Sequence, residues 1–78
     1  MNQKEISFEL KPYMDDAPVL NDFYKSSLLN GYQELIDKSI DESKSYTTRL
    51  HYSGEAFGFR QALTMLGYEI VEKVGEKN

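Results

Sequence analysis

The stretch that decides the fold is Tyr46–Leu66, which reads YTTRLHYSGEAFGFRQALTML. Five of its apolar or small residues recur at spacings of four, three, four and three, and they are Tyr52, Ala56, Phe59, Leu63 and Leu66. This spacing predicts a helix with a heptad-like seam on one side. Gly67 follows at once and is suited to the left-handed conformation that ends many helices.

The opposite side of this predicted helix is apolar as well, because it carries Leu50, Phe57 and Met65. A helix at the surface of a small domain needs only one apolar stripe. We therefore expect the 46–66 helix to be buried on two sides. A second helix of the chain can cover one side, and something else must cover the other.

Gly54, Gly58 and Ala62 lie four residues apart and form a ridge of small residues on this helix. Each glycine costs about 1 kcal/mol relative to alanine inside a helix, so the ridge indicates a close approach by another element. Three interpretations are open. The two helices of the chain approach there, two copies of the helix cross in a dimer, or the helix breaks at 53–55 and Ser53 caps a shorter one.

A first helix is predicted over residues 18–43, with a turn at about 42–45 leading into the second. Its apolar residues recur mostly at spacings of three and four, and they are Leu20, Tyr24, Leu28, Tyr32, Leu35 and Ile36. Pro18 is tolerated in a first turn, and Asp22 favours the positive end of the helix dipole. A short turn between two helices makes them antiparallel neighbours.

The two ends of the chain show weaker patterns. In the arm and turn at residues 1–17, Ile6, Phe8 and Leu10 alternate with polar residues, which is typical of a strand. In the tail at 67–78, the segment 68–71 is predicted as a short strand that pairs with the arm, an extended tail, or a further helical turn. The expected fold is a single small, mainly α domain. It is an antiparallel two-helix hairpin with an extended N-terminal arm and a short C-terminal strand or tail.

Composition narrows the possible functions. The 78 residues include no Cys and one His, so disulfides are excluded and a structural zinc site lacks ligands. The formal net charge of −4 argues against direct nucleic-acid binding. No apolar run approaches a membrane span and no secretory leader is evident, so we expect a cytoplasmic protein. No cofactor or metal is expected.

Candidate catalytic and cation-binding groups are few. His51 has Glu55 one helical turn away, but no nucleophile or third orienting group accompanies them. Asp15, Asp16 and Asp22 do not have the spacing of a calcium loop. Helix-surface and turn roles explain these residues better, so we expect no enzyme and no catalytic residues.

Asp37, Asp41 and Glu42 form a candidate acidic patch late in the first helix. Rows of acidic side chains on a helix imitate nucleic-acid phosphates and occupy basic grooves. Lys38 and Lys44 interrupt this patch, which favours an ordinary solvated face.

The candidate interaction residues therefore lie on the second helix, where aromatic residues, an arginine and small residues combine as they do at protein interfaces. They are Tyr52, Gly54, Phe57, Gly58, Phe59, Arg60, Ala62 and Met65. A chain of this size gains stability by association, so we expect a homodimer or a protein partner.

The segment 54–68, GEAFGFRQALTMLGY, resembles the second half of small helical-hairpin orphan proteins encoded by phages and mobile elements of Gram-positive bacteria. The resemblance covers the last third of the chain and rests on its small residues, its Ala-Leu pair and its Leu-Gly-aromatic ending. It implies an accessory protein that binds a host or phage protein, such as an inhibitor of a host defence nuclease, and it transfers no catalytic residue. The alternatives are a homo-oligomeric structural or assembly protein and an acidic nucleic-acid mimic.

Overall fold

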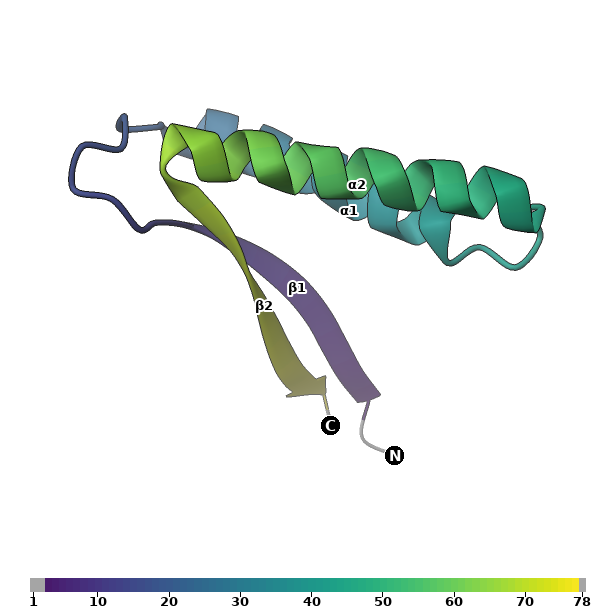
Figure 1. The fold of residues 1–78 in the computed structure, drawn as a ribbon. Coiled ribbons are helices and arrows are strands. Elements are labelled where there is room, and N and C mark those ends of the chain that lie inside the picture. The colour runs from purple at the N-terminus through teal and green to yellow at the C-terminus, as the bar shows by residue number, and fades with distance from the viewer. Residues whose placement is uncertain (1–2, 78) are drawn as a thin grey trace.

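The fold places a helical hairpin over a two-stranded ribbon (Figure 1). The computed structural model describes the backbone of residues 3–77 and the side chains of residues 7–73. Strand β1 (Gln3–Pro12) leads through a loop to helix α1 (Asp22–Ser39), and a short turn connects α1 to helix α2 (Tyr46–Leu66). Strand β2 (Tyr68–Lys77) then returns to pair with β1. The predicted mainly α hairpin is present, with a sheet built from both ends of the chain.

Helix α1 is shorter at both ends than the predicted 18–43. It begins after Asn21, whose side-chain Oδ1 accepts a hydrogen bond from the Tyr24 N–H at 2.9 Å. Residues 18–20 are extended instead, and Leu20 still packs on the core from there. At the other end, Asp41 accepts hydrogen bonds from the N–H and the hydroxyl of Ser43, which favours a turn over further helix.

Helix α2 has the bounds that its sequence predicts and is continuous through Gly54. The prediction of a break at 53–55 is therefore wrong. The cap residue is Ser45, whose hydroxyl oxygen accepts from the Thr48 N–H at 3.2 Å. Gly67 ends the helix with φ of 103°, and a Cβ on it would lie 3.0 Å from the Ala17 Cβ. Glycine thus meets both a backbone and a packing requirement at this corner.

The two strands pair antiparallel along ten residues each, from Gln3↔Lys77 to Pro12↔Tyr68. The arm is thus a full strand, and 68–71 begins a longer strand than predicted and not a helical turn. Phe8, Leu10, Tyr68 and Ile70 share one face of the ribbon by this register. The side chain of Ile6, which contributed to the predicted alternation, lies outside the described residues.

The core is small and lies where the proximal half of the ribbon meets the helices. Leu10, Leu63 and Tyr68 form its buried centre. Tyr32 of α1 is also buried and connects the layers, because its ring lies 4.9 Å from the Phe8 ring and 6.1 Å from the Phe59 ring. The Tyr68 hydroxyl donates to the Pro18 carbonyl, so the buried phenol is satisfied.

The molecule exposes more surface than its mass requires. Its accessible surface is 6018 Å², whereas a compact monomer of 9.0 kDa exposes about 4,900 Å². The radius of gyration is 14.2 Å, against about 11.5 Å for a compact chain of this length. Part of the difference comes from the ribbon, whose free end runs away from the helices (Figure 1). The rest comes from apolar side chains left exposed on the helices and the β1–α1 loop.

Candidate interaction surface

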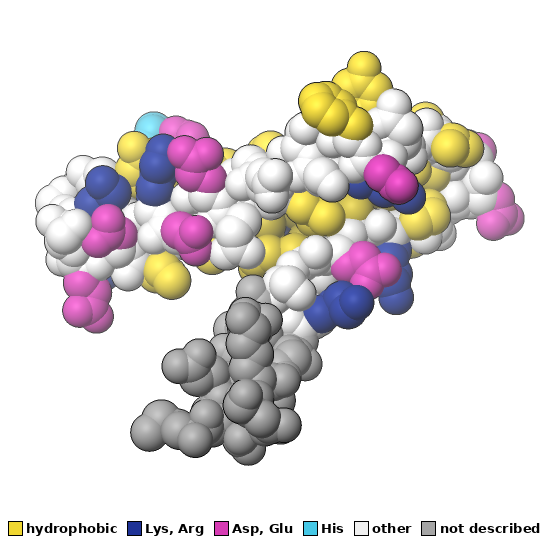
Figure 2. Space-filling model, turned by 180° about the vertical axis from the view of Figure 1, so that it is seen from behind, with side chains coloured by type: hydrophobic (Ala, Val, Ile, Leu, Met, Phe, Trp, Pro, Cys, Tyr) yellow, Lys and Arg dark blue, Asp and Glu magenta, His cyan; other side chains and the backbone are white. Residues whose placement is uncertain are grey.

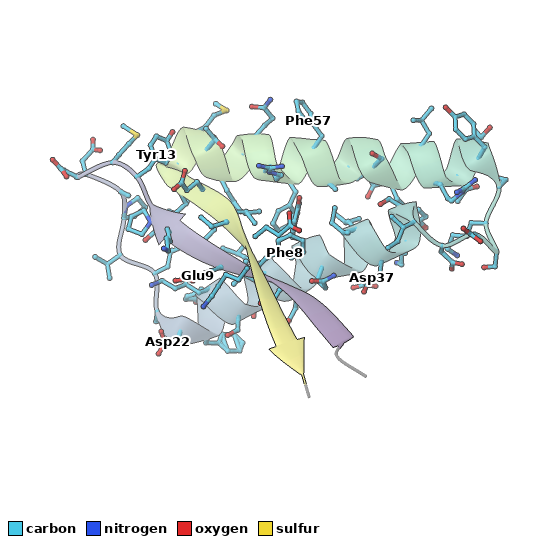
Figure 3. All side chains as sticks on the ribbon, turned by 90° about the horizontal axis from the view of Figure 1, so that it is seen from below. Phe8, Glu9, Tyr13, Asp22, Asp37 and Phe57 are labelled. Atoms are coloured by element: carbon cyan, nitrogen blue, oxygen red, sulfur yellow. The ribbon has the colours of Figure 1, made fainter. Side chains whose placement is uncertain are left out.

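Helix α2 has two apolar sides, of which one is buried and the other is exposed. Ala56 and Leu63 face α1 and the ribbon and are buried, at 3% and 6% exposure. The other side is covered by none of the residues that the structure describes, and Phe57 and Met65 are 62% and 87% exposed there. Figure 3 shows Phe57 on the side of α2 that points away from α1, and Figure 2 shows hydrophobic side chains protruding on the upper side of the molecule. The second covering element that the sequence demands is therefore not part of the described chain.

We call this exposed side the outward face of α2. At 100° per residue its members fall within less than half of the helix circumference. They are Tyr46, Leu50, Gly54, Phe57, Gly58, Gln61, Ala62 and Met65. All eight are exposed. The face runs nearly the full length of the helix, about 28 Å at 1.5 Å per residue.

The ridge of small residues belongs to the outward face. A Cβ built on Gly54 or on Gly58 would meet no atom within 4 Å. The interpretation in which the two helices of one chain approach at this ridge is therefore wrong. The interpretations that survive place another molecule against these glycines.

The close approach within the chain occurs at Gly31 instead. A Cβ on Gly31 of α1 would lie 3.6 Å from the Phe59 ring of α2. The absent side chain at this position lets the Phe59 ring lie against the α1 backbone. The sequence did not indicate this contact, because nothing in the pattern of α1 shows which aromatic residue of α2 would face Gly31.

The structure divides the predicted interaction residues between the two sides. Five of them lie on the outward face, and they are Gly54, Phe57, Gly58, Ala62 and Met65. Tyr52 and Phe59 lie on the inward side and are half-buried, with Phe59 against Tyr32 and Tyr52 beneath the Lys38 ammonium at 5.3 Å. Arg60 is exposed at the border. Tyr46 and Leu50 were not among the predicted residues, although their four-residue spacing to Gly54 was a usable signal.

Ionised side chains stay at the borders of the outward face. None of its eight members is Asp, Glu, Lys or Arg. His51 falls within the arc of the face, next to Ala62, and its Nε2 lies 2.6 Å from a carboxylate oxygen of Glu55, which stands at one border. Arg60 occupies the other border. An uncharged apolar centre with charges at its rim is the usual composition of a protein–protein contact.

Two members of the predicted acidic patch, Asp37 and Asp41, take part in local hydrogen bonds. Gln33 donates to Asp37 at 3.0 Å. Asp41 accepts hydrogen bonds from the N–H and the hydroxyl of Ser43 in the turn after α1, and these bonds lower the pKa of its carboxyl. Between them, Lys38 forms an ion pair with Glu34 at 3.1 Å, which raises the pKa of the ammonium. Asp37 lies on α1, away from the outward face of α2 (Figure 3).

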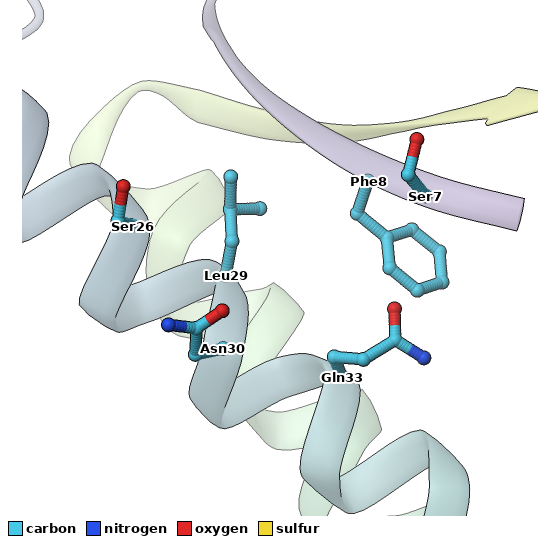
Figure 4. Close-up of a pocket in the computed structure, with 6 residues that line it drawn as sticks. All are labelled: Ser7, Phe8, Ser26, Leu29, Asn30 and Gln33. Carbon is cyan, nitrogen blue, oxygen red and sulfur yellow. The ribbon is translucent and has the colours of Figure 1, made fainter.

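Two hollows lie on other parts of the surface. A cleft of about 230 Å³ between β1 and α1 is lined by hydroxyl, amide and apolar side chains, among them Ser7, Phe8, Asn30 and Gln33 (Figure 4). A wider hollow of about 480 Å³ lies beneath the β1–α1 loop, where Met14 and Val19 are exposed. Among the residues that the structure describes, the lining of the first cleft holds no ionisable side chain.

Neither a cluster of metal-binding side chains nor a membrane-spanning helix occurs in the residues that the structure describes. Across those residues, no three His, Asp or Glu side chains gather as a metal site would need. Neither described helix has the length and apolar content needed to cross a membrane. No family model, curated protein or solved structure matches the chain.

Proposed function

We propose that the protein is a small, non-enzymatic protein-interaction module of phage origin that binds a host or phage protein and modulates or inhibits it. The outward face of α2 carries the proposal. It is long, apolar, uncharged at its centre and left open by the rest of the chain. The resemblance of segment 54–68 to phage-encoded hairpin proteins supports the setting, and a host defence nuclease is one target of the proposed kind.

The physical argument is that the face is too costly to leave in water without a partner. Four of its large side chains are more than half exposed, and they are Tyr46, Leu50, Phe57 and Met65. Burying such side chains contributes about 1.5–3 kcal/mol each. Gly54 and Gly58 lower the stability of the helix and make no close contact inside the chain. A partner that lies against the face explains both features.

Substitution of Phe57 tests the proposal. Phe57→Ala removes the central ring of the face, and we expect it to weaken protein binding while the helical circular dichroism is retained. Phe23→Ala is the matched control, since Phe23 is 71% exposed on α1, away from this face. Binding that is equally strong for wild type, Phe57→Ala and Phe23→Ala would argue against the outward face as the working surface.

The acidic mimic is the alternative that salt separates from this proposal. A mimic binds a basic groove through charge, so its affinity falls steeply as ionic strength rises. A contact made by Phe57, Leu50 and Met65 persists in high salt, because apolar burial is not screened. Target binding that disappears at high salt and survives Phe57→Ala would favour the mimic.

A further inference from the structure

We propose that the partner of the outward face is a second copy of the chain, packed antiparallel with its own α2 against this one. The inference rests on the proposed function for the surface that it uses, and it gives this surface to a second copy, so that a host or phage target would bind the dimer that the face forms. Three observations carry it: the symmetry of the face about its midpoint, the placement of charge, and the surplus of exposed surface.

The outward face matches itself when it is turned around. The midpoint of its stretch from Leu50 to Met65 falls between Phe57 and Gly58, so that a two-fold axis there places each Phe57 ring on the bare backbone at the partner's Gly58. Leu50 lies seven residues before Phe57, and Met65 lies seven residues after Gly58, so these two side chains meet across the axis. A surface that offers both a protrusion and its receiving site is what a two-fold dimer requires.

Open space at the glycines makes this approach feasible. Since a Cβ on Gly58 would meet nothing within 4 Å, the space that a side chain would occupy is available to a ring from outside. Within the chain, Gly31 receives the Phe59 ring in the same way. The dimer contact at Gly58 repeats between chains a packing arrangement that the fold already uses.

The charges allow two copies to meet. No Asp, Glu, Lys or Arg lies in the outward face, and the His51 side chain within its arc is already paired with Glu55 at the border. Glu55 and Arg60 flank the face from opposite borders, where they stay in contact with solvent after pairing. In an antiparallel pair each Arg60 stands level with residue 55 of the partner. The two Arg60 residues are then separated by about 7.5 Å along the helix axis, at a rise of about 1.5 Å per residue.

The exposed area agrees with a dimer. The chain exposes about 1,100 Å² more than a compact monomer of its mass. A standard protein–protein interface buries about 800 Å² on each partner. Pairing of two copies would therefore bring the surface of each close to that of an ordinary folded chain, with the projecting ribbon accounting for the remainder.

Absolute mass by light scattering across a dilution series is the first test. We expect a mass of two chains for wild type and one chain for Gly58→Leu, whose added side chain fills the receiving site. Phe57→Ala should weaken dimerisation by at least about 30-fold, the loss typical of a central interface residue. Phe23→Ala should leave the mass unchanged. Retained helical circular dichroism shows that Gly58→Leu is folded.

Cross-linking tests the orientation, and the absence of Cys from the chain makes single-cysteine variants unambiguous. A short thiol cross-linker should join Leu50→Cys to Met65→Cys in a mixture and join neither variant to itself. In the antiparallel pair two copies of residue 50 stand about 22 Å apart along the helix axis. Self-joining of each variant would overturn the antiparallel arrangement.

The outcomes separate this inference from the proposed function. A wild type that is monomeric when concentrated, with target binding that Phe57→Ala abolishes, overturns the second copy as partner and keeps the interaction module. A monomer whose target binding is unchanged by Phe57→Ala overturns both. A dimer that persists in Gly58→Leu and in Phe57→Ala overturns the inference, because association then uses another surface.

Discussion

The inward and outward sides of α2 are nearly equal in apolar content, yet only one of them forms a core. On the inward side Leu63 is 6% exposed, and on the outward side Leu50 is 57% exposed. The inward side packs against α1 and the ribbon of the same chain, whereas no described element packs against the outward side. Helix periodicity reports how many sides a helix can bury, and the number of other elements in the chain decides how many it does bury.

Truncation of matched leucines gives the largest expected difference between the sides. Leu63→Ala should lower the free energy of unfolding by about 3 kcal/mol, because it leaves a cavity in the small core. Leu50→Ala should change the free energy by less than about 0.5 kcal/mol, since its side chain is exposed in the single chain. Chemical denaturation at low protein concentration measures both. Equal losses for the two variants would contradict the division of α2 into two sides.

Enlarging a glycine on each side gives the next effect. Gly31→Leu should destabilise the fold by about 1–3 kcal/mol, because side-chain atoms beyond Cβ meet the Phe59 ring. Gly58→Leu should not destabilise the single chain, because its Cβ meets open space and leucine is the better helix former. Thermal unfolding at high dilution measures the pair. A loss at Gly58 as large as the loss at Gly31 would mean that the outward face is covered within one chain.

Gly54→Ala should stabilise the single chain by about 1 kcal/mol. The gain arises because Gly54 sits mid-helix with open space at its Cβ position, so alanine adds helix propensity without a clash. Denaturant titration of the dilute protein gives the value. If the chain dimerises as proposed, the same substitution leaves a smaller gain at high concentration, where the added methyl group meets the partner.

The smallest effect lies in the turn between the helices, which belongs to neither side of α2. Hydrogen bonds from the Ser43 hydroxyl and N–H hold the pKa of the Asp41 carboxyl below that of an ordinary aspartate. A carboxyl with a depressed pKa in the folded state stabilises the fold above its unfolded pKa, and this contribution is lost as pH falls through the folded pKa. Ser43→Ala should raise the pKa of Asp41, as NMR titration would show. The variant and the wild type should then differ in free energy of unfolding only at pH values above the pKa of Asp41.

The sequence predicted the helices better than it predicted their ends. Gly67 and the seam from Tyr52 to Leu66 were enough to place α2. The start of α1 was misplaced because Leu20 continues the apolar spacing although it precedes the helix and packs on the core from there. The helix begins after Asn21, which accepts a hydrogen bond from the Tyr24 N–H as the N-cap residue. The middle of β2 shows no apolar alternation at Glu72 and Lys73, because both side chains are exposed and the backbone there is held by pairing with β1.

The two apolar sides of α2 could be predicted from the sequence, but the side that faces the rest of the chain could not. Phe57 and Phe59 are two residues apart, and both lie in an apolar context in the sequence. Only the position of Gly31 and Tyr32 on α1 decides that Phe59 turns inward. That information is a contact between distant residues, which periodicity along one helix does not contain.

The pairing of β1 with β2 makes the whole helical hairpin the loop of a β-hairpin. The strands are separated by the 55 residues between Pro12 and Tyr68. Closing a flexible loop of that length costs about 2 kcal/mol more than closing a four-residue loop. Formation of α1 and α2 before the strands meet removes most of that cost, because the packed helices already hold the two strand roots together. Folding should therefore proceed from the middle of the chain outward, with the ribbon closing last.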